Sequence, residues 1–134
     1  MARPTRQYTI CKLATVAGID MNAVAETTLY TVPTNLPDGN ALSACVITHV
    51  VFRNCDLAAA LNTANFGFGF NATEDDVISA GVKGANVDTQ LKYRVLVADD
   101  GAVIGVGGDL FKIGVDIAQG AACTMTVDVF GYLI

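Results

Sequence analysis

The C-terminal stretch CTMTVDVFGYLI, residues 123–134, decides the fold. Its apolar and polar residues alternate: Cys123, Met125, Val127 and Val129 fall on one face, and Thr124, Thr126 and Asp128 on the other. A side-chain period of two is typical of a β-strand with one buried face. The stretch therefore predicts a long strand over 123–133, with Val127 and Val129 in the core.

Seven further runs rich in β-branched and aromatic residues precede this strand. They are Tyr8–Val16, Glu26–Val32, Ser43–Asn54, Ala64–Asn71, Leu91–Ala98, Ala102–Val106 and Phe111–Ile117. The segments between them contain Pro, Gly, Asn and Asp in combinations typical of turns. Helix signals are limited to one short turn after Thr73 and one over Asp56–Leu61. We expect an all-β protein: a single antiparallel β-sandwich, jelly-roll-like, with about eight strands.

Two of these strands differ in how clearly they indicate a buried face. The run 91–98 places Leu91, Tyr93, Val95 and Val97 on one face and Lys92 and Arg94 on the other. This alternation predicts that the apolar set is buried and the charged set is in water. The run 43–54 is apolar on both faces, with Val46, Val50 and Phe52 on one and Ile47 and Val51 on the other. A strand of this kind indicates packing on its own core and on a neighbour.

Length and composition limit the classes of partner. The chain has 134 residues, so we expect residues 1–134 to form one domain, with residues 1–7 as a candidate N-terminal arm. Only 16% of the residues are charged, which predicts that another subunit covers part of the surface. The net charge of −5 disfavours nucleic acid as a partner. No apolar run is long enough to cross a bilayer, so we expect no membrane partner.

Paired carboxylates and the single histidine give no catalytic arrangement. Asp75-Asp76 and Asp99-Asp100 are adjacent in sequence, and neighbours cannot face each other across a substrate. Asp99-Asp100-Gly101 is typical of a hairpin turn. His49 lies in the middle of a strand without a nucleophile motif. Gly105–Gly108 leads into a strand rather than a helix, so it predicts a turn instead of a phosphate-binding loop.

Cysteines and aromatic residues are also better explained by structure than by chemistry. The four cysteines (Cys11, Cys45, Cys55 and Cys123) show no CxxC spacing, which argues against zinc and for free thiols in a reducing compartment. Phe66, Phe68 and Phe70 alternate with glycines and are expected in the core, although such a ladder could also stack on sugar rings. We therefore predict a protein that is not an enzyme and has no catalytic, cofactor-binding or metal-binding residues.

Two segments resemble small bacteriophage structural proteins. TTLYTVP, residues 27–33, is followed by a strand that ends near Arg53-Asn54, and this order is similar to the opening of those proteins. The segment from Gly108 to Ile134 is similar to their closing hairpin, in which a GD-F strand turns into a TVTVFG strand. The ladder at 66–70 and the acidic residues Glu74–Asp76 have no counterpart in this pattern.

The resemblance implies a capsid decoration or cement protein, a non-enzymatic virion component that is usually a trimeric β-sandwich. It implies a homotrimer that binds the major capsid protein from outside and bridges capsomers. The expected location is the outer capsid surface of the virion, after synthesis in the host cytoplasm. The acidic charge agrees with an outer position, because a protein facing the lumen meets DNA phosphate. The alternative is a carbohydrate- or receptor-binding tail or fibre module that uses the phenylalanine face or loop tips.

Overall fold

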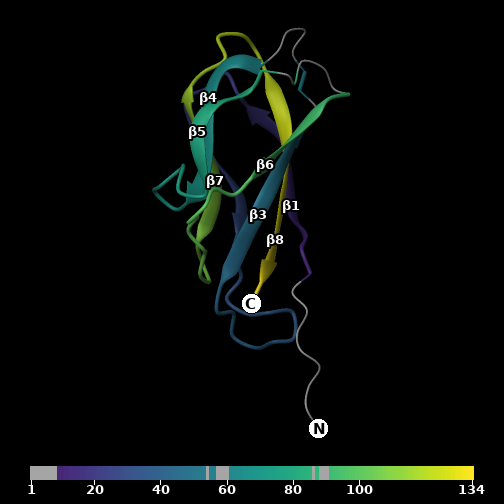
Figure 1. The fold of residues 1–134 in the computed structure, drawn as a ribbon, viewed down its shortest axis with the longest axis vertical. Helices are drawn as coiled ribbons and strands as arrows, with labels where there is room; N and C mark the ends of the chain where they lie inside the picture. Colours follow the sequence, from purple (N-terminus) through teal and green to yellow (C-terminus); the bar gives the residue numbers. More distant parts are fainter. Residues whose placement is uncertain (1–8, 54, 57–60, 86, 88–90) are drawn as a thin grey trace.

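A computed structural model describes residues 9–53, 55–56, 61–85, 87 and 91–134. These residues form eight strands in two antiparallel four-stranded sheets, and none of them lies in a helix (Figure 1). The strands are β1 (Cys11–Asp20), β2 (Glu26–Thr31), β3 (Cys45–Arg53), β4 (Leu61–Phe70), β5 (Ile78–Gly84), β6 (Tyr93–Val97), β7 (Leu110–Ile117) and β8 (Thr124–Leu133).

The order of the strands is that of a jelly roll. One sheet has the order β1-β8-β3-β6 and the other β2-β7-β4-β5. The antiparallel pairs β1 with β8, β2 with β7, β3 with β6, and β4 with β5 are those of one long hairpin. Wrapping that hairpin into two packed sheets gives a jelly roll of eight strands. The predicted all-β sandwich is therefore confirmed.

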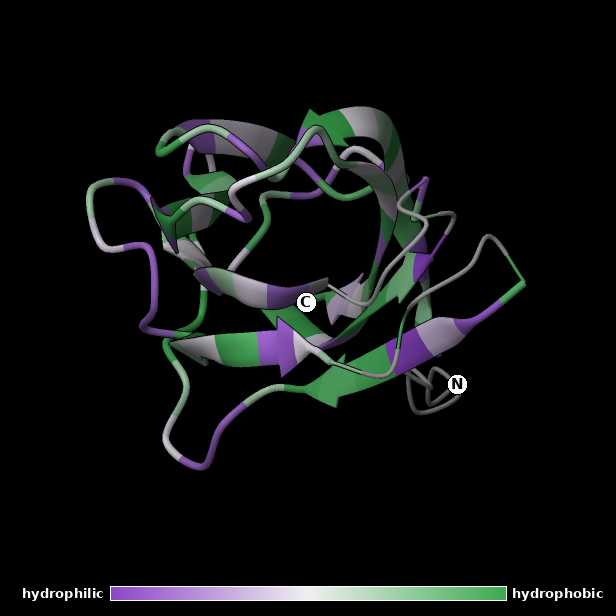
Figure 2. Ribbon diagram, turned by 90° about the horizontal axis from the view of Figure 1, so that it is seen from above, coloured by the Kyte–Doolittle hydropathy of each residue, from purple (hydrophilic) through white to green (hydrophobic). Residues whose placement is uncertain are grey.

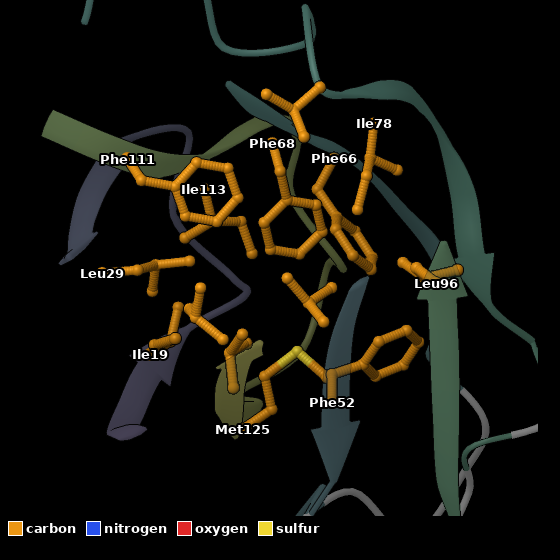
Figure 3. Close-up of a cluster of buried hydrophobic side chains, with 14 of the residues drawn as sticks. Ile19, Leu29, Phe52, Phe66, Phe68, Ile78, Leu96, Phe111, Ile113 and Met125 are labelled. Atoms are coloured by element: carbon orange, nitrogen blue, oxygen red, sulfur yellow. The ribbon is translucent and has the colours of Figure 1, made fainter. Parts of the chain in front are cut away.

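The core lies between the sheets and is built from the alternating faces that the sequence indicates. Val127 and Val129 of β8 are completely buried, as predicted. Figure 3 shows Met125 of the same strand beside Phe52, below the side chains of the opposite sheet. Viewed from above, the strands of the two sheets surround this core (Figure 2). Strand β8 is central because it pairs with both β1 and β3.

The phenylalanine ladder of β4 belongs to this core. Phe66 and Phe68 are fully buried and Phe70 is 4% exposed, with Phe66 edge-on to Phe52 of the other sheet. The intervening glycines face the other way, where the chain comes too close for a side chain. A Cβ on Gly69 would overlap the carbonyl oxygen of Thr73. A sugar cannot reach these rings, so the proposed stacking face of the carbohydrate-binding alternative is wrong.

Two element predictions between β4 and β7 are wrong. Residues 102–106 form no strand, and only Gly105 pairs there, through a two-way backbone bridge to Cys45. Conversely, no strand was predicted over 78–84, where the structure has β5. Its sequence ISAGVKG contains small residues and glycines, which have low β propensity. Its pairing with β4 overrides that propensity. The turn after Thr73 is present without a helix, and most of the predicted turn over 56–61 falls outside the described residues.

Strand β3 appears two-sided in sequence because it contains a β-bulge. Its register with β8 shifts between Ile47 and His49, so Thr48 is an extra residue. Cys45 and Ile47 are buried before the bulge, and Val50 and Phe52 are buried after it. Ile47 therefore shares the core face with Val50 and Phe52, and the expected split of the two sets was wrong. The outward apolar face of β3 is correspondingly smaller than expected.

Candidate interaction surface

The apolar face of β6 points to solvent, opposite to the prediction. The exposed fractions are 95% for Leu91, 67% for Tyr93, 44% for Val95 and 68% for Val97. Leu96, on the face that carries Arg94, is 7% exposed and fills the core. The strand is at the edge of its sheet, where it pairs with β3 (Figure 1). A row of exposed apolar side chains on one strand makes this face a candidate interaction surface.

The exposed apolar row continues beyond the end of β6. The amide of Ala98 donates to the carbonyl of Thr48 (2.9 Å), and Gly105 pairs with Cys45, so the chain contacts β3 at both points. Between them it turns toward the other sheet, where the amides of Asp99 and Val103 donate to the carbonyls of Val77 and Asp76. Seven of the eleven exposed large apolar side chains of the described residues lie here: Leu91, Tyr93, Val95, Val97, Val103, Ile104 and Val106. We call these seven residues the apolar edge.

A shallow hollow of about 350 Å³ lies at one end of the apolar edge, lined by Val51, Arg53, Leu91, Lys92 and Tyr93. Arg53 is held there by Asp128 of β8, with 2.8 Å between Nε and Oδ2. Thr15 of β1 donates a hydrogen bond of 2.7 Å to the same carboxylate. These hydrogen bonds, that of Arg53 above all, lower the pKa of Asp128. This network of hydrogen bonds fixes the side chain of Arg53, which borders the hollow.

The remaining polar candidates from the sequence have structural contacts. His49 stacks on Phe130, with ring centroids 4.6 Å apart, and its Nδ1 lies 2.9 Å from the Thr48 hydroxyl. Asp99 accepts hydrogen bonds from Ser79 on β5, from both the backbone amide and the hydroxyl, and these bonds lower the pKa of Asp99. Asp76 accepts from the amide of Phe70. These groups are not brought together into one site.

The four cysteines are free, as expected, and three of them are buried. Burial raises the pKa of Cys45 to about 11. Burial and the neighbouring Cys55 thiol, 3.6 Å away, raise the pKa of Cys123 to about 12. Within the described residues, no group of three or more His, Cys, Asp or Glu side chains is arranged to hold a metal ion. That part of the chain also contains no helix suited to crossing a membrane.

A pair of neighbouring carboxyl groups on the second sheet was not predicted. Glu74, in the turn between β4 and β5, lies directly on Gly114 of β7, where any side chain would overlap it. There it meets Glu26 of β2, whose carboxylate is 2.8 Å from the Lys112 ammonium. The hydrogen bond with Glu26, together with burial and the charges of Glu26 and Asp116, raises the pKa of Glu74 to about 7, although Lys112 opposes the shift. The hydrogen bond from Glu74 lowers the pKa of Glu26.

This pair predicts a loss of stability as the pH rises. Glu74 keeps its proton in the folded protein up to a pH near 7, whereas in the unfolded chain it releases the proton near pH 4.5. The stabilisation is complete below about pH 4.5 and is lost as the pH rises through about 7. Glu74→Gln should reduce the fall in melting temperature between pH 5 and 8, because this is the range in which Glu74 releases its proton in the folded protein. Asp75→Asn, at an exposed position on the same turn, should keep the wild-type slope, and an equal slope in both variants would contradict the assignment.

Comparisons with known proteins give a fold and no family. No protein-family model matches the chain, and no curated protein matches it. The structure is similar to a chain of the solved structure "Cyanophage Pam1 capsid asymmetric unit", with a TM-score of 0.52. The match covers 100% of this chain and 93% of that chain at 15% sequence identity. At this identity the similarity establishes the fold alone.

Proposed function

We propose that this protein is a structural component of a phage virion that decorates and stabilises the capsid from the outside. In this role it forms a homotrimer, binds the major capsid protein and bridges capsomers after synthesis in the host cytoplasm. The observation that carries the proposal is the apolar edge, which a small jelly roll exposes along one side of a sheet. The fold similarity to a chain of a phage capsid asymmetric unit supports it.

Charge supports the position on the outer surface. The chain has a net charge of −5, and an acidic protein is repelled by packaged DNA, so the proposal includes no nucleic-acid partner. It also includes no membrane partner. We further propose that residues 1–134 act as one domain with residues 1–7 as an arm. One hydrophobic cluster shared by both sheets of the described residues supports the single domain.

The proposal assigns no catalytic, cofactor-binding or metal-binding residue to this chain. The polar candidates in the described residues make hydrogen bonds that hold strands and turns together, such as Asp99 with Ser79 and Asp128 with Arg53. Jelly rolls serve both in capsids and in lectins, so the fold does not choose between these roles. The choice rests on the apolar edge, because six of its seven exposed side chains are aliphatic and only Tyr93 has a ring on which a sugar could stack.

Depletion of the protein from particles tests the proposed function. Stripped particles should lose resistance to heat or internal pressure and still adsorb to host cells, and adding the purified protein back should restore the resistance. Three subunits that bind a repeated lattice together can bind tightly through weak single contacts. Particles that lose adsorption at unchanged heat resistance would instead indicate the receptor-binding alternative. A protein absent from purified particles would contradict both.

A further inference from the structure

We propose that the apolar edge is the surface through which copies of this chain contact one another. In the homotrimer of the proposed function, on which this inference rests, the edges of three copies meet around the threefold axis. The occupant of the edge is thus a second and third copy of the same chain.

The strand at the centre of this edge has an open side. Among the described residues, β6 pairs with β3 alone and ends the sheet. Unpaired strand edges favour association, and proteins commonly protect them with charge, proline or a covering segment. Here the side chain of Arg94 reaches the carbonyl of Lys83 on β5. The outward row Tyr93, Val95 and Val97 contains no charged residue to keep another chain away.

The area of the apolar edge is that of the apolar part of a subunit contact. The exposed fractions of its seven residues together equal a little more than four fully exposed residues. Burying a large apolar side chain contributes about 1.5–3 kcal/mol at roughly 25 cal/mol per Å², which corresponds to roughly 60–120 Å² for each side chain, so the apolar edge exposes on the order of 250–500 Å² of apolar surface. Each partner in a standard interface contributes roughly 800 Å², of which a little more than half is apolar. The apolar edge therefore supplies the apolar part of a specific contact between copies.

Charge favours a copy of this chain as the occupant. The chain is acidic overall, so most of the surface of one copy repels another. The segment 91–98 contains Lys92 and Arg94 and no carboxylate, whereas Asp99 and Asp100 lie in the turn before Val103, so this repulsion is weakest over the β6 part of the apolar edge. Tyr93, beside the hollow that it shares with Val51, is suited to be an anchor because tyrosine is enriched among residues that dominate binding energy.

Sedimentation of matched lysine variants tests the assignment. Val97→Lys and Ile104→Lys place charges in the proposed contact, whereas Val24→Lys changes a valine with the same exposed fraction, 68%, outside it. At micromolar concentration the wild type and Val24→Lys should sediment as trimers. The other two variants should sediment as monomers with unchanged melting cooperativity, a weakening of association of at least about a hundredfold, since a buried unpaired charge costs several kcal/mol. Trimeric Val97→Lys and Ile104→Lys would overturn the assignment of the edge and leave the homotrimer intact.

Hydrogen exchange of the wild type provides a second test that needs no variant. Backbone amides of 91–106 should exchange at least about tenfold more slowly in the trimer than after dilution to monomers, and amides near Val24 should not change. Equal exchange of 91–106 in both states would overturn the proposal even if a lysine variant failed to fold. A wild type that is monomeric at every concentration would instead contradict the homotrimer of the proposed function.

Discussion

Val127→Asp is expected to abolish cooperative folding. Val127 is completely buried in the central strand β8, where it pairs with Val16 of β1 and Phe52 of β3. A carboxylate there would have no partner and would lose its hydration. We expect a cost above about 4 kcal/mol, a large part of the roughly 5–15 kcal/mol that stabilises a typical domain. The variant should be insoluble or show no thermal transition by circular dichroism.

The neighbouring residue shows that the environment, and not charge as such, causes this effect. Asp128 is also largely buried, but it lies on the outer face of the sheet and accepts hydrogen bonds from Arg53 and Thr15. Val24→Asp, with 68% of the residue exposed, is the matched control and should melt within about 2 °C of the wild type. A soluble Val127→Asp with an unchanged melting temperature would disprove the predicted role of β8.

The sequence predicted the fold best where apolar and polar residues alternate along a strand. The runs 111–117 and 123–133 correspond to β7 and β8, and the apolar residues of these strands lie in the core. On the other face of β8, Thr126 and Asp128 are buried as well. The turn prediction at Asp99–Gly101 also agrees, since the Ala102 amide donates to the Asp99 carbonyl and Gly101 has φ +75°. It is a turn without a hairpin, because 102–106 is not a strand. Strand β5 was missed because its pairing with β4 overrides low propensity.

The candidate surface could not be located from the sequence because period-two alternation does not say which face is inside. In β6 the charged residues Lys92 and Arg94 indicated the wet face, yet Leu96 on that face is the residue that enters the core. The low charge content predicted a covered surface and the sequence placed it on β3, whereas the exposed apolar side chains lie on β6 and in the segment 103–106. The Glu26–Glu74 pair depends on a contact between two segments distant in sequence, which no local pattern predicts.

Gly131→Ala is expected to destabilise the protein strongly, although it adds only one methyl group. Gly131 pairs with Cys11 of β1 and Ile47 of β3, beside the β-bulge. A Cβ there would overlap the carbonyl oxygen of Val46 and lie 3.1 Å from the Cα of Ile47. These are backbone atoms, so the central strands must separate. Overpacking of this kind costs on the order of 3 kcal/mol, or roughly 10 °C in melting temperature.

Gly81→Ala on β5 is the matched control for this change. A Cβ there would meet only the end of the Lys83 side chain, 3.6 Å from Nζ, which is flexible and can move. Because alanine loses less conformational entropy on folding than glycine, this variant should melt at or slightly above the wild-type temperature. The difference between the two variants in one calorimetric series isolates the close approach of β8 to β3. If Gly131→Ala melts within about 2 °C of Gly81→Ala, β8 does not contact β3 as described, and the jelly-roll pairing on which the apolar edge depends fails with it.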